Sequence, residues 1–175
     1  ARKLHDEGFA CSVIHSDVAN GDAEFQLFKE NKTKVLICTD ILSRGIDVTS
    51  VGVVINYDVP RLFVDGCGFT DRANNSTYAH RIARCSRMGN PGTAITLTKA
   101  SYNGRSDATV VSEIEQHFDT KLVEWSENDI EELATKHAEL QSGAVTLPAV
   151  VDEKAGPAPA PVAEAVVEKA NASWT

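Results

Sequence analysis

Apolar and polar positions along the chain predict strands and helices that alternate. Short apolar runs rich in β-branched residues predict strands over residues 10–15, 34–39, 51–57 and 93–98, with an edge strand over 122–125. Apolar residues at helical spacing predict helices over residues 22–30 and 107–118, capped by Asp107 in the second case, and another from 128 or 129 onward. Because crossovers of this kind are right-handed, we expect an α/β fold with one parallel sheet flanked by helices.

Composition divides the chain near residue 142. From Gly143 onward it consists largely of Ala, Val, Pro and Glu, and Pro157, Pro159 and Pro161 alternate with other residues. Such a segment predicts disorder, so we expect a domain over residues 1–142 and a disordered C-terminal tail over 143–175. Residues 1–8 look like the end of a helix that Gly8 stops, so we expect the domain to be N-terminally incomplete.

Acidic residues outnumber basic ones, but unevenly. The formal net charge is −8; residues 1–100 carry twelve Lys and Arg against eleven Asp and Glu, a net of +1, whereas residues 101–142 carry three against ten, a net of −7. Since the distribution of charge matters more than its sum, the acidic total does not exclude a nucleic-acid partner.

Cysteine spacing and hydropathy indicate the cellular compartment. The four cysteines form no Cys-x-x-Cys pair, so we expect reduced, mostly buried thiols and no metal site. No apolar run reaches the length of a membrane span, and the N-terminus lacks the order of a signal peptide. We expect an intracellular, monomeric protein without a membrane partner.

One segment, residues 78–89, concentrates positive charge. Arg81, Arg84 and Arg87 recur at intervals of three behind His80. Residues three apart share a helix face, so we expect a row of guanidinium groups, whose planar donors suit phosphate oxygens. A solvated basic helix face explains the spacing equally well.

A second polar cluster follows the apolar run 35–38. It contains Thr39, Gly45 and Asp47. Chain that follows a parallel strand lies at the carboxyl edge of the sheet, where open α/β sheets bind ligands. The two clusters could therefore share one ligand.

Together these clusters resemble a known family. The sequence TDILSRGID over residues 39–47 is similar to the TDxxARGxD element of the DEAD-box RNA helicases, and HRIARCSR over residues 80–87 to their HRxGRxxR element. Further similarity at residues 13–17, 53–60 and 92–97 extends the resemblance over about residues 1–140. The long segment between Pro60 and Tyr78 resembles the branch that acts in mRNA export at the nuclear pore.

The resemblance implies a C-terminal RecA-like lobe and a role for each matching residue. In this family ATP lies between two RecA-like lobes, and RNA crosses both. The implied roles are arginine fingers for Arg84 and Arg87, ATP binding for Gly45 and Asp47, RNA binding for Thr39 and Ser16, and contact between lobes for His80 and Arg81.

Some elements of the family are absent. The sequence has no Gly-x-x-x-x-Gly-Lys-Ser/Thr loop and no Asp-Glu-Ala-Asp sequence, so we expect ATP and Mg²⁺ to be held mainly by an N-terminal lobe. The resemblance implies an ATP-dependent RNA helicase as a full-length protein, with an inactive isolated chain. Implied partners are RNA, that lobe and a nuclear-pore activator, in the cytoplasm and nucleus.

Departures from the family pattern support an alternative. Ala83, Cys85 and Ser86 replace the usual Gly, Thr and Gly, and residues 17–25 lack the Gln-x-x-Arg pair that grips RNA. The alternative is a catalytically inactive RecA-like module that binds a protein partner. A hydrolase relay of His15, Ser16 and Asp17 is disfavoured because consecutive strand residues point to opposite faces.

Overall fold

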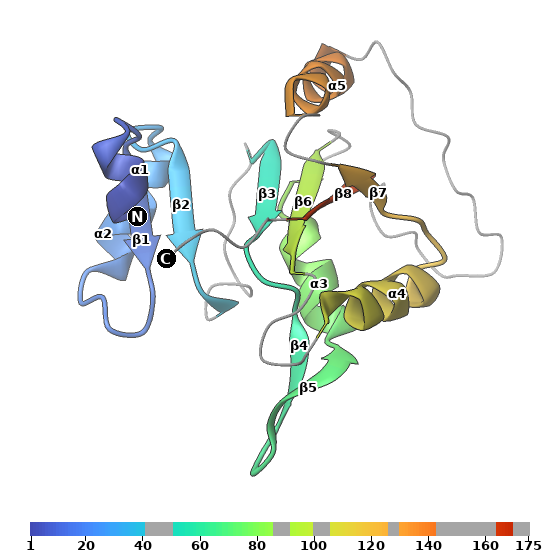
Figure 1. Ribbon diagram of the computed structural model, residues 1–175. Helices are drawn as coiled ribbons and strands as arrows, with labels where there is room; N and C mark the ends of the chain where they lie inside the picture. Colours follow the sequence, from blue (N-terminus) through green and yellow to red (C-terminus); the bar gives the residue numbers. More distant parts are fainter. Residues whose placement is uncertain (41–50, 86–91, 100–105, 126–129, 143–163, 170–175) are drawn as a thin grey trace, which may run out of the picture. The chain divides into compact units, whose positions relative to one another are not determined.

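The computed structural model describes residues 1–40, 51–85, 92–99, 106–125, 130–142 and 164–169 (Figure 1). The chain divides into two compact units, residues 1–48 and 49–175, and each is described by itself. None of the described helices is long and apolar enough to cross a membrane.

The first unit contains a strand, a helix and a second strand, as predicted. Helix α1 (Arg2–Asp6) leads to β1 (Cys11–Ile14), α2 (Gly21–Lys29) and β2 (Val35–Cys38). The two strands pair in parallel, from Cys11 opposite Val35 to Ile14 opposite Cys38. Gly8, with φ of +87°, ends the first helical segment in a conformation that glycine adopts without steric cost.

The second unit contains a four-stranded parallel sheet. Its strands, in spatial order, are β3 (Val53–Asn56), β6 (Thr93–Thr98), β8 (Glu164–Lys169) and β7 (Val123–Trp125). The described helices of this unit are α3 (Asn75–Ile82), α4 (Asp107–His117) and α5 (Ile130–Ser142). The parallel sheet with helical connections confirms the predicted fold class.

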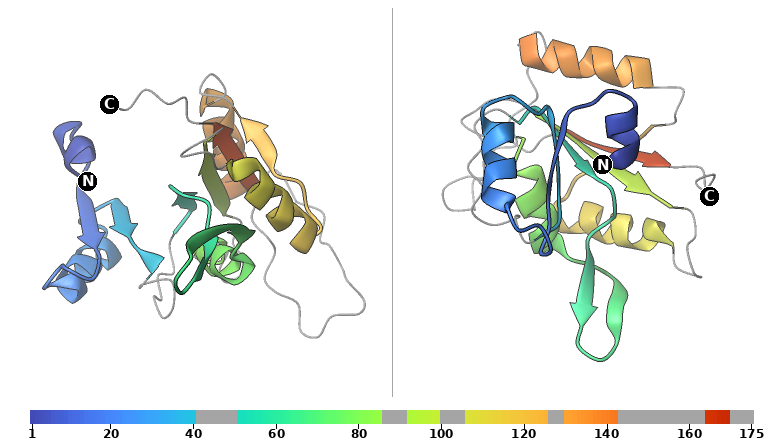
Figure 2. Two further views of the ribbon diagram at one scale, coloured as in Figure 1. Left: turned by 60° about the horizontal axis from the view of Figure 1, so that its bottom comes forward. Right: turned by 90° about the vertical axis from the view of Figure 1, so that its left-hand side faces the viewer.

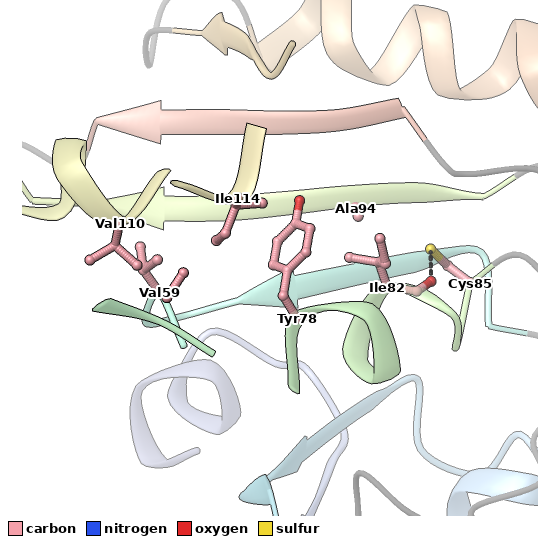
Figure 3. Packing of buried hydrophobic residues seen from close by; sticks show 8 residues of the cluster. Val59, Tyr78, Ile82, Cys85, Ala94, Val110 and Ile114 are labelled. Atoms are coloured by element: carbon pink, nitrogen blue, oxygen red, sulfur yellow. Dashed lines mark hydrogen bonds between the residues drawn. The ribbon is translucent and has the colours of Figure 1, made fainter. Parts of the chain in front are cut away.

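Two helices and the sheet form the core of this unit. Tyr78 and Ile82 from α3 and Val110 and Ile114 from α4 lie in one buried cluster with Ala94 of β6 (Figure 3). Tyr78 is 1% exposed, and Val110, Ile114 and Ala94 are fully buried. The cluster therefore fixes α3 and α4 against the strand between them in sequence.

A β-hairpin, which the sequence analysis did not predict, precedes α3. Strands β4 (Arg61–Val64) and β5 (Gly68–Ala73) pair antiparallel and form a separate two-stranded sheet. Two views show the hairpin projecting away from the four-stranded sheet of its unit (Figure 1; Figure 2, right). Its turn uses Gly66 at φ of +80°, and the Cys67 amide donates to the Val64 carbonyl at 3.0 Å.

Strand β8 differs from the disordered tail expected over residues 143–175. Residues 164–169 pair in parallel with both β6 and β7, whereas the rest of the expected tail lies outside the described residues. Pairing with strands distant in sequence supplies order that tail composition does not reveal. The domain boundary at residue 142 stays a prediction.

Two local expectations are also corrected. Ser106, not Asp107, is the N-cap of α4, because its hydroxyl accepts from the Ala108 amide at 3.2 Å. The cysteines were expected to be mostly buried, but Cys38 and Cys67 are exposed. Cys38 is the last residue of β2, and Cys67 lies in the hairpin turn.

Candidate functional site

Helix α3 positions the basic segment of the candidate site. The Asn74 side chain caps its first turn by accepting from the Thr77 amide at 3.0 Å. Tyr78 and Ile82 point into the core, and His80 and Arg81 occupy the last turn. The buried face thus holds the helix while its basic residues lie outside the core.

The helix ends earlier than predicted. Its last residue is Ile82, and the amides of Arg84 and Cys85 donate to carbonyls three residues back, both at 3.1 Å. Such bonds tighten the chain into a 3₁₀-type turn. The prediction of one continuous helix is therefore wrong at Arg84, which lies in the turn after α3.

Gly92 explains part of this tight geometry. A Cβ atom placed on Gly92 would lie 1.8 Å from the carbonyl oxygen of Cys85, far closer than real contacts allow. The backbone at the start of β6 therefore approaches the end of the turn as only glycine permits. Replacing Gly92 would displace the segment that carries Arg84.

Arg81 binds the carboxyl end of β3. Its guanidinium donates to the Asp58 carbonyl at 2.9 Å and to the Asn56 side-chain oxygen at 3.5 Å, and lies 3.8 Å from the Asp58 carboxylate. The Asn56 amide donates in turn to the Thr96 hydroxyl at 3.1 Å. Only 15% of the Arg81 side chain is exposed. Arg81 therefore ties α3 to the sheet, and its predicted contact with another lobe stays a prediction.

Arg84 is held by the helix that precedes it. Its Nε donates to the His80 carbonyl at 3.0 Å, so a group near the end of α3 fixes the root of the guanidinium. Arg84 is partly exposed. The planar guanidinium group of an arginine suits phosphate oxygens, because its donors form a fixed fork.

The groups beneath these arginines are held neutral by burial. Burial raises the pKa of the Tyr78 phenol to about 12 and that of the Cys85 thiol to about 11. The Cys85 thiol also donates to the Ile82 carbonyl at 3.1 Å (Figure 3). Neither Tyr78 nor Cys85 therefore contributes charge to this region at neutral pH.

In the first unit, the two residues predicted to bind RNA follow neighbouring strands. Ser16 comes shortly after β1, and Thr39 directly follows β2. The Thr39 amide donates to the Ile14 carbonyl at 3.3 Å, which joins the two strand ends, and both residues are exposed. The Ser16 hydroxyl donates to Asp17 at 3.2 Å rather than to His15, so these contacts form no hydrolase relay.

Several predicted site residues cannot be placed. Gly45, Asp47 and Arg87 lie outside the described residues, and the two units are not positioned relative to each other. Convergence of the arginines and the carboxylate on one nucleotide therefore stays a prediction. Over the part of the chain that the structure describes, no cluster of three His, Cys, Asp or Glu side chains could hold a metal ion.

The partners of Arg81 were missed by the sequence analysis. Asn56 is a buried polar residue at the end of β3, Thr96 is a buried polar residue within β6, and Asp58 follows β3. The polar residues that end the apolar run 53–55 were the available signal, because they mark the carboxyl edge of the sheet.

Comparison with known proteins identifies the family. Residues 1–89, about half of the chain, match the helicase conserved C-terminal domain. The chain belongs to this family. The helicase domain is 44% identical over 104 residues to the ATP-dependent RNA helicase DBP5 of Meyerozyma guilliermondii, which covers 57% of the chain and 20% of DBP5. The identification as a DEAD-box helicase C-terminal lobe is confirmed.

Solved structures agree with this assignment. Saccharomyces cerevisiae Dbp5 bound to RNA and ADP BeF3 has a TM-score of 0.68 at 31% identity, over 80% of the helicase domain chain and 34% of Dbp5. The C-terminal domain of a Dbp5 variant bound to Gle1 and IP6 has a TM-score of 0.63 at 30% identity, over 81% of this chain and 74% of that domain. The chain spans a fifth to a third of the longer relatives.

Proposed function

We propose that this helicase domain is the C-terminal lobe of an ATP-dependent RNA helicase that remodels RNA in mRNA export. It binds the RNA backbone and supplies arginine fingers to ATP that an N-terminal lobe holds. The observation that carries the proposal is the position of Arg84. It lies in a turn that follows α3, where its Nε donates to the His80 carbonyl, and the backbone of Gly92 closely approaches Cys85 in the same turn. Such a preorganised cation stabilises charge that develops on a transferring phosphoryl group.

The proposed ATP site uses four residues of this chain. Arg84 and Arg87 face the γ-phosphate, and Gly45 and Asp47 contact the nucleotide. ATP supplies the phosphoryl group, with Mg²⁺ held on the N-terminal lobe. Arg81 and His80 place Arg84, since Arg81 fixes the last turn of α3 to β3 and the His80 carbonyl accepts from Arg84.

RNA contacts come from the carboxyl edge of the first unit. Thr39 and Ser16 are exposed on chain that follows adjacent parallel strands, where they can reach sugar-phosphate groups. Contacts to the sugar-phosphate backbone carry no direct sequence information. We therefore propose RNA binding with little sequence preference, in the cytoplasm and nucleus and at the nuclear pore, where a nuclear-pore activator is a further partner. The structure of a Dbp5 C-terminal domain bound to Gle1 supports a protein partner for this lobe.

Fusion to the N-terminal lobe of a DBP5 relative tests the proposal through RNA-stimulated ATP hydrolysis. Arg84→Ala and Arg87→Ala should each lower kcat by about 10³ to 10⁵, because arginine fingers act mainly in the transition state. Arg72→Ala is the matched control, since Arg72 is a highly exposed arginine that pairs with Glu113 on the same unit. Unchanged kcat in both finger variants would end the assignment.

A second candidate function is a catalytically inactive module that binds a protein partner. The projecting hairpin with exposed apolar residues favours it, as do the replaced motif residues. If the wild-type fusion has no ATPase activity although it folds and binds ATP, this candidate becomes the better one.

A further inference from the structure

The β4–β5 hairpin exposes an unusual amount of apolar surface. Phe63 is 59% exposed, Phe69 58%, Val64 46% and Leu62 40%. The two phenylalanines lie opposite each other in the strand register, with ring centroids 5.3 Å apart in an edge-to-face arrangement. Phe63 and Phe69 therefore form an exposed apolar pair in contact with each other, and exposed apolar side chains of this kind indicate a site of interaction.

The hairpin is rigid at its base and open beyond it. Arg61 donates to Asp71 at 2.8 Å and to Asp107 at the start of α4 at 2.6 Å, and the Ala73 amide donates to Glu113 at 2.8 Å. Over the described part of the chain, neither strand pairs with a third one. An isolated two-stranded hairpin is only marginally stable, so these contacts between its base and α4 help to stabilise it.

Charge around the patch selects the occupant. Residues 61–73 and 107–117 together contain two arginines and five acidic residues, a net of −3. Both arginines are bound by carboxylates, Arg61 by Asp71 and Asp107 and Arg72 by Glu113. Glu115 is in turn paired with Lys121 at 2.8 Å, which leaves a net negative charge around the hairpin. A negative surface disfavours phosphate backbones and favours a cationic partner.

We propose that the hairpin is a docking site for an extended segment of a partner protein that carries alternating apolar and Lys or Arg residues. The apolar side chains cover Phe63 and Phe69, the backbone adds to an open strand edge, and the basic side chains face Asp65 and the acidic surroundings. Addition of a strand gives main-chain hydrogen bonds, while alternate side chains give specificity. The inference does not depend on the proposed ATPase or RNA-binding function.

Selection from a displayed library of short random peptides on the full 175-residue chain tests the proposal. Peptides that also bind the F63S/F69S double variant are removed from the pool, and the remaining peptides are sequenced. We expect alternating apolar and basic residues, and a dissociation constant that rises about tenfold or more in the double variant. Asp65→Lys should weaken the same peptides to a smaller extent, because it reverses the charge at the tip.

Phe9→Ser is the matched control, since Phe9 is 54% exposed but lies in the first unit. It should leave peptide affinity unchanged, and thermal unfolding checks that every variant is folded. Retention of acidic peptides, or equal affinity for the wild type and both hairpin variants, would overturn the proposal. So would loss of poly(U) binding in F63S/F69S, which indicates base stacking, or a dimer that this variant dissociates, which indicates a second copy.

Discussion

The core of the second unit and the β4–β5 hairpin use apolar residues in opposite ways. In the core, Tyr78, Val110 and Ile114 are at most 1% exposed and hold α3 and α4 on β6. In the hairpin, Phe63 and Phe69 are more than half exposed, although the same unit contains both regions. Apolar burial therefore organises the helices that carry the basic residues, whereas in the hairpin it reaches Ala73, the last residue of β5.

Polar contacts also hold the hairpin at its base. Arg61 joins β4 to α4 through Asp107, whose second carboxylate oxygen accepts from the Lys99 amide at the end of β6. One carboxylate therefore links the hairpin, a sheet strand and a helix. The difference teaches that one unit positions its helices mainly by apolar burial and its hairpin largely by charged side chains.

Truncation of one apolar residue in each region should separate the two uses. Ile114→Ala should lower the free energy of unfolding by about 2 to 5 kcal/mol, because it leaves a cavity in a packed core. Phe69→Ala should cost at most about 1 kcal/mol, mostly through the lost aromatic pair. Urea denaturation of the full chain measures both, and similar losses would show that the hairpin also belongs to the folding core.

Removal of two arginines should show which contacts anchor the hairpin. Arg61 and Asp107 have side chains only 13% and 16% exposed, so Arg61→Ala leaves a poorly solvated carboxylate and should cost roughly 2 to 4 kcal/mol. Arg72 is 71% exposed and pairs with Glu113 at the same 2.6 Å distance, so Arg72→Ala should cost about 0 to 1 kcal/mol. Equal losses in urea denaturation would contradict the anchoring role of Arg61.

Most of the core could be predicted from the sequence, because it depends on local patterns. The β-branched runs that form β3 and β6, and the helical spacing of Val110 and Ile114, are visible in short windows. The hairpin had a local signal too, since Asp65 and Gly66 follow an apolar run and such pairs are typical of hairpin turns. The hairpin was not predicted, because the sequence analysis used only the length of the segment between Pro60 and Tyr78.

The candidate site was predictable in residue type but not in contact. The basic motif located Arg81 and Arg84, yet the partners of Arg81 lie 23 and 25 residues earlier in the chain. No local pattern predicts that the end of β3 lies next to the last turn of α3, because this proximity results from packing of the helix on the sheet. Strand β8 was missed for the same reason, since its neighbours are β6 and β7.

One cysteine from each region provides the smallest and most local test. Cys85 is 2% exposed and burial raises its pKa to about 11 from the ordinary 9, whereas Cys67 is exposed in the hairpin turn. Alkylation requires the thiolate, so iodoacetamide should modify Cys67 at pH 8 while Cys85 stays protected in the folded chain. Peptide mapping by mass spectrometry measures both sites in one sample.

The same shift makes stability depend on pH in a defined direction. Because the folded-state pKa of Cys85 is raised, its contribution is fully present below about pH 9 and is lost as the pH rises through about 11. Cys85→Ala should therefore lose less stability than the wild type between these values, while Cys67→Ala should follow the wild type. The phenol of Tyr78, with its pKa raised to about 12 from the ordinary 10, lowers stability over a partly overlapping range, but all three proteins retain Tyr78, so the comparison is unaffected. Parallel stability curves for wild type and Cys85→Ala would show that the thiol ionises without opening the core.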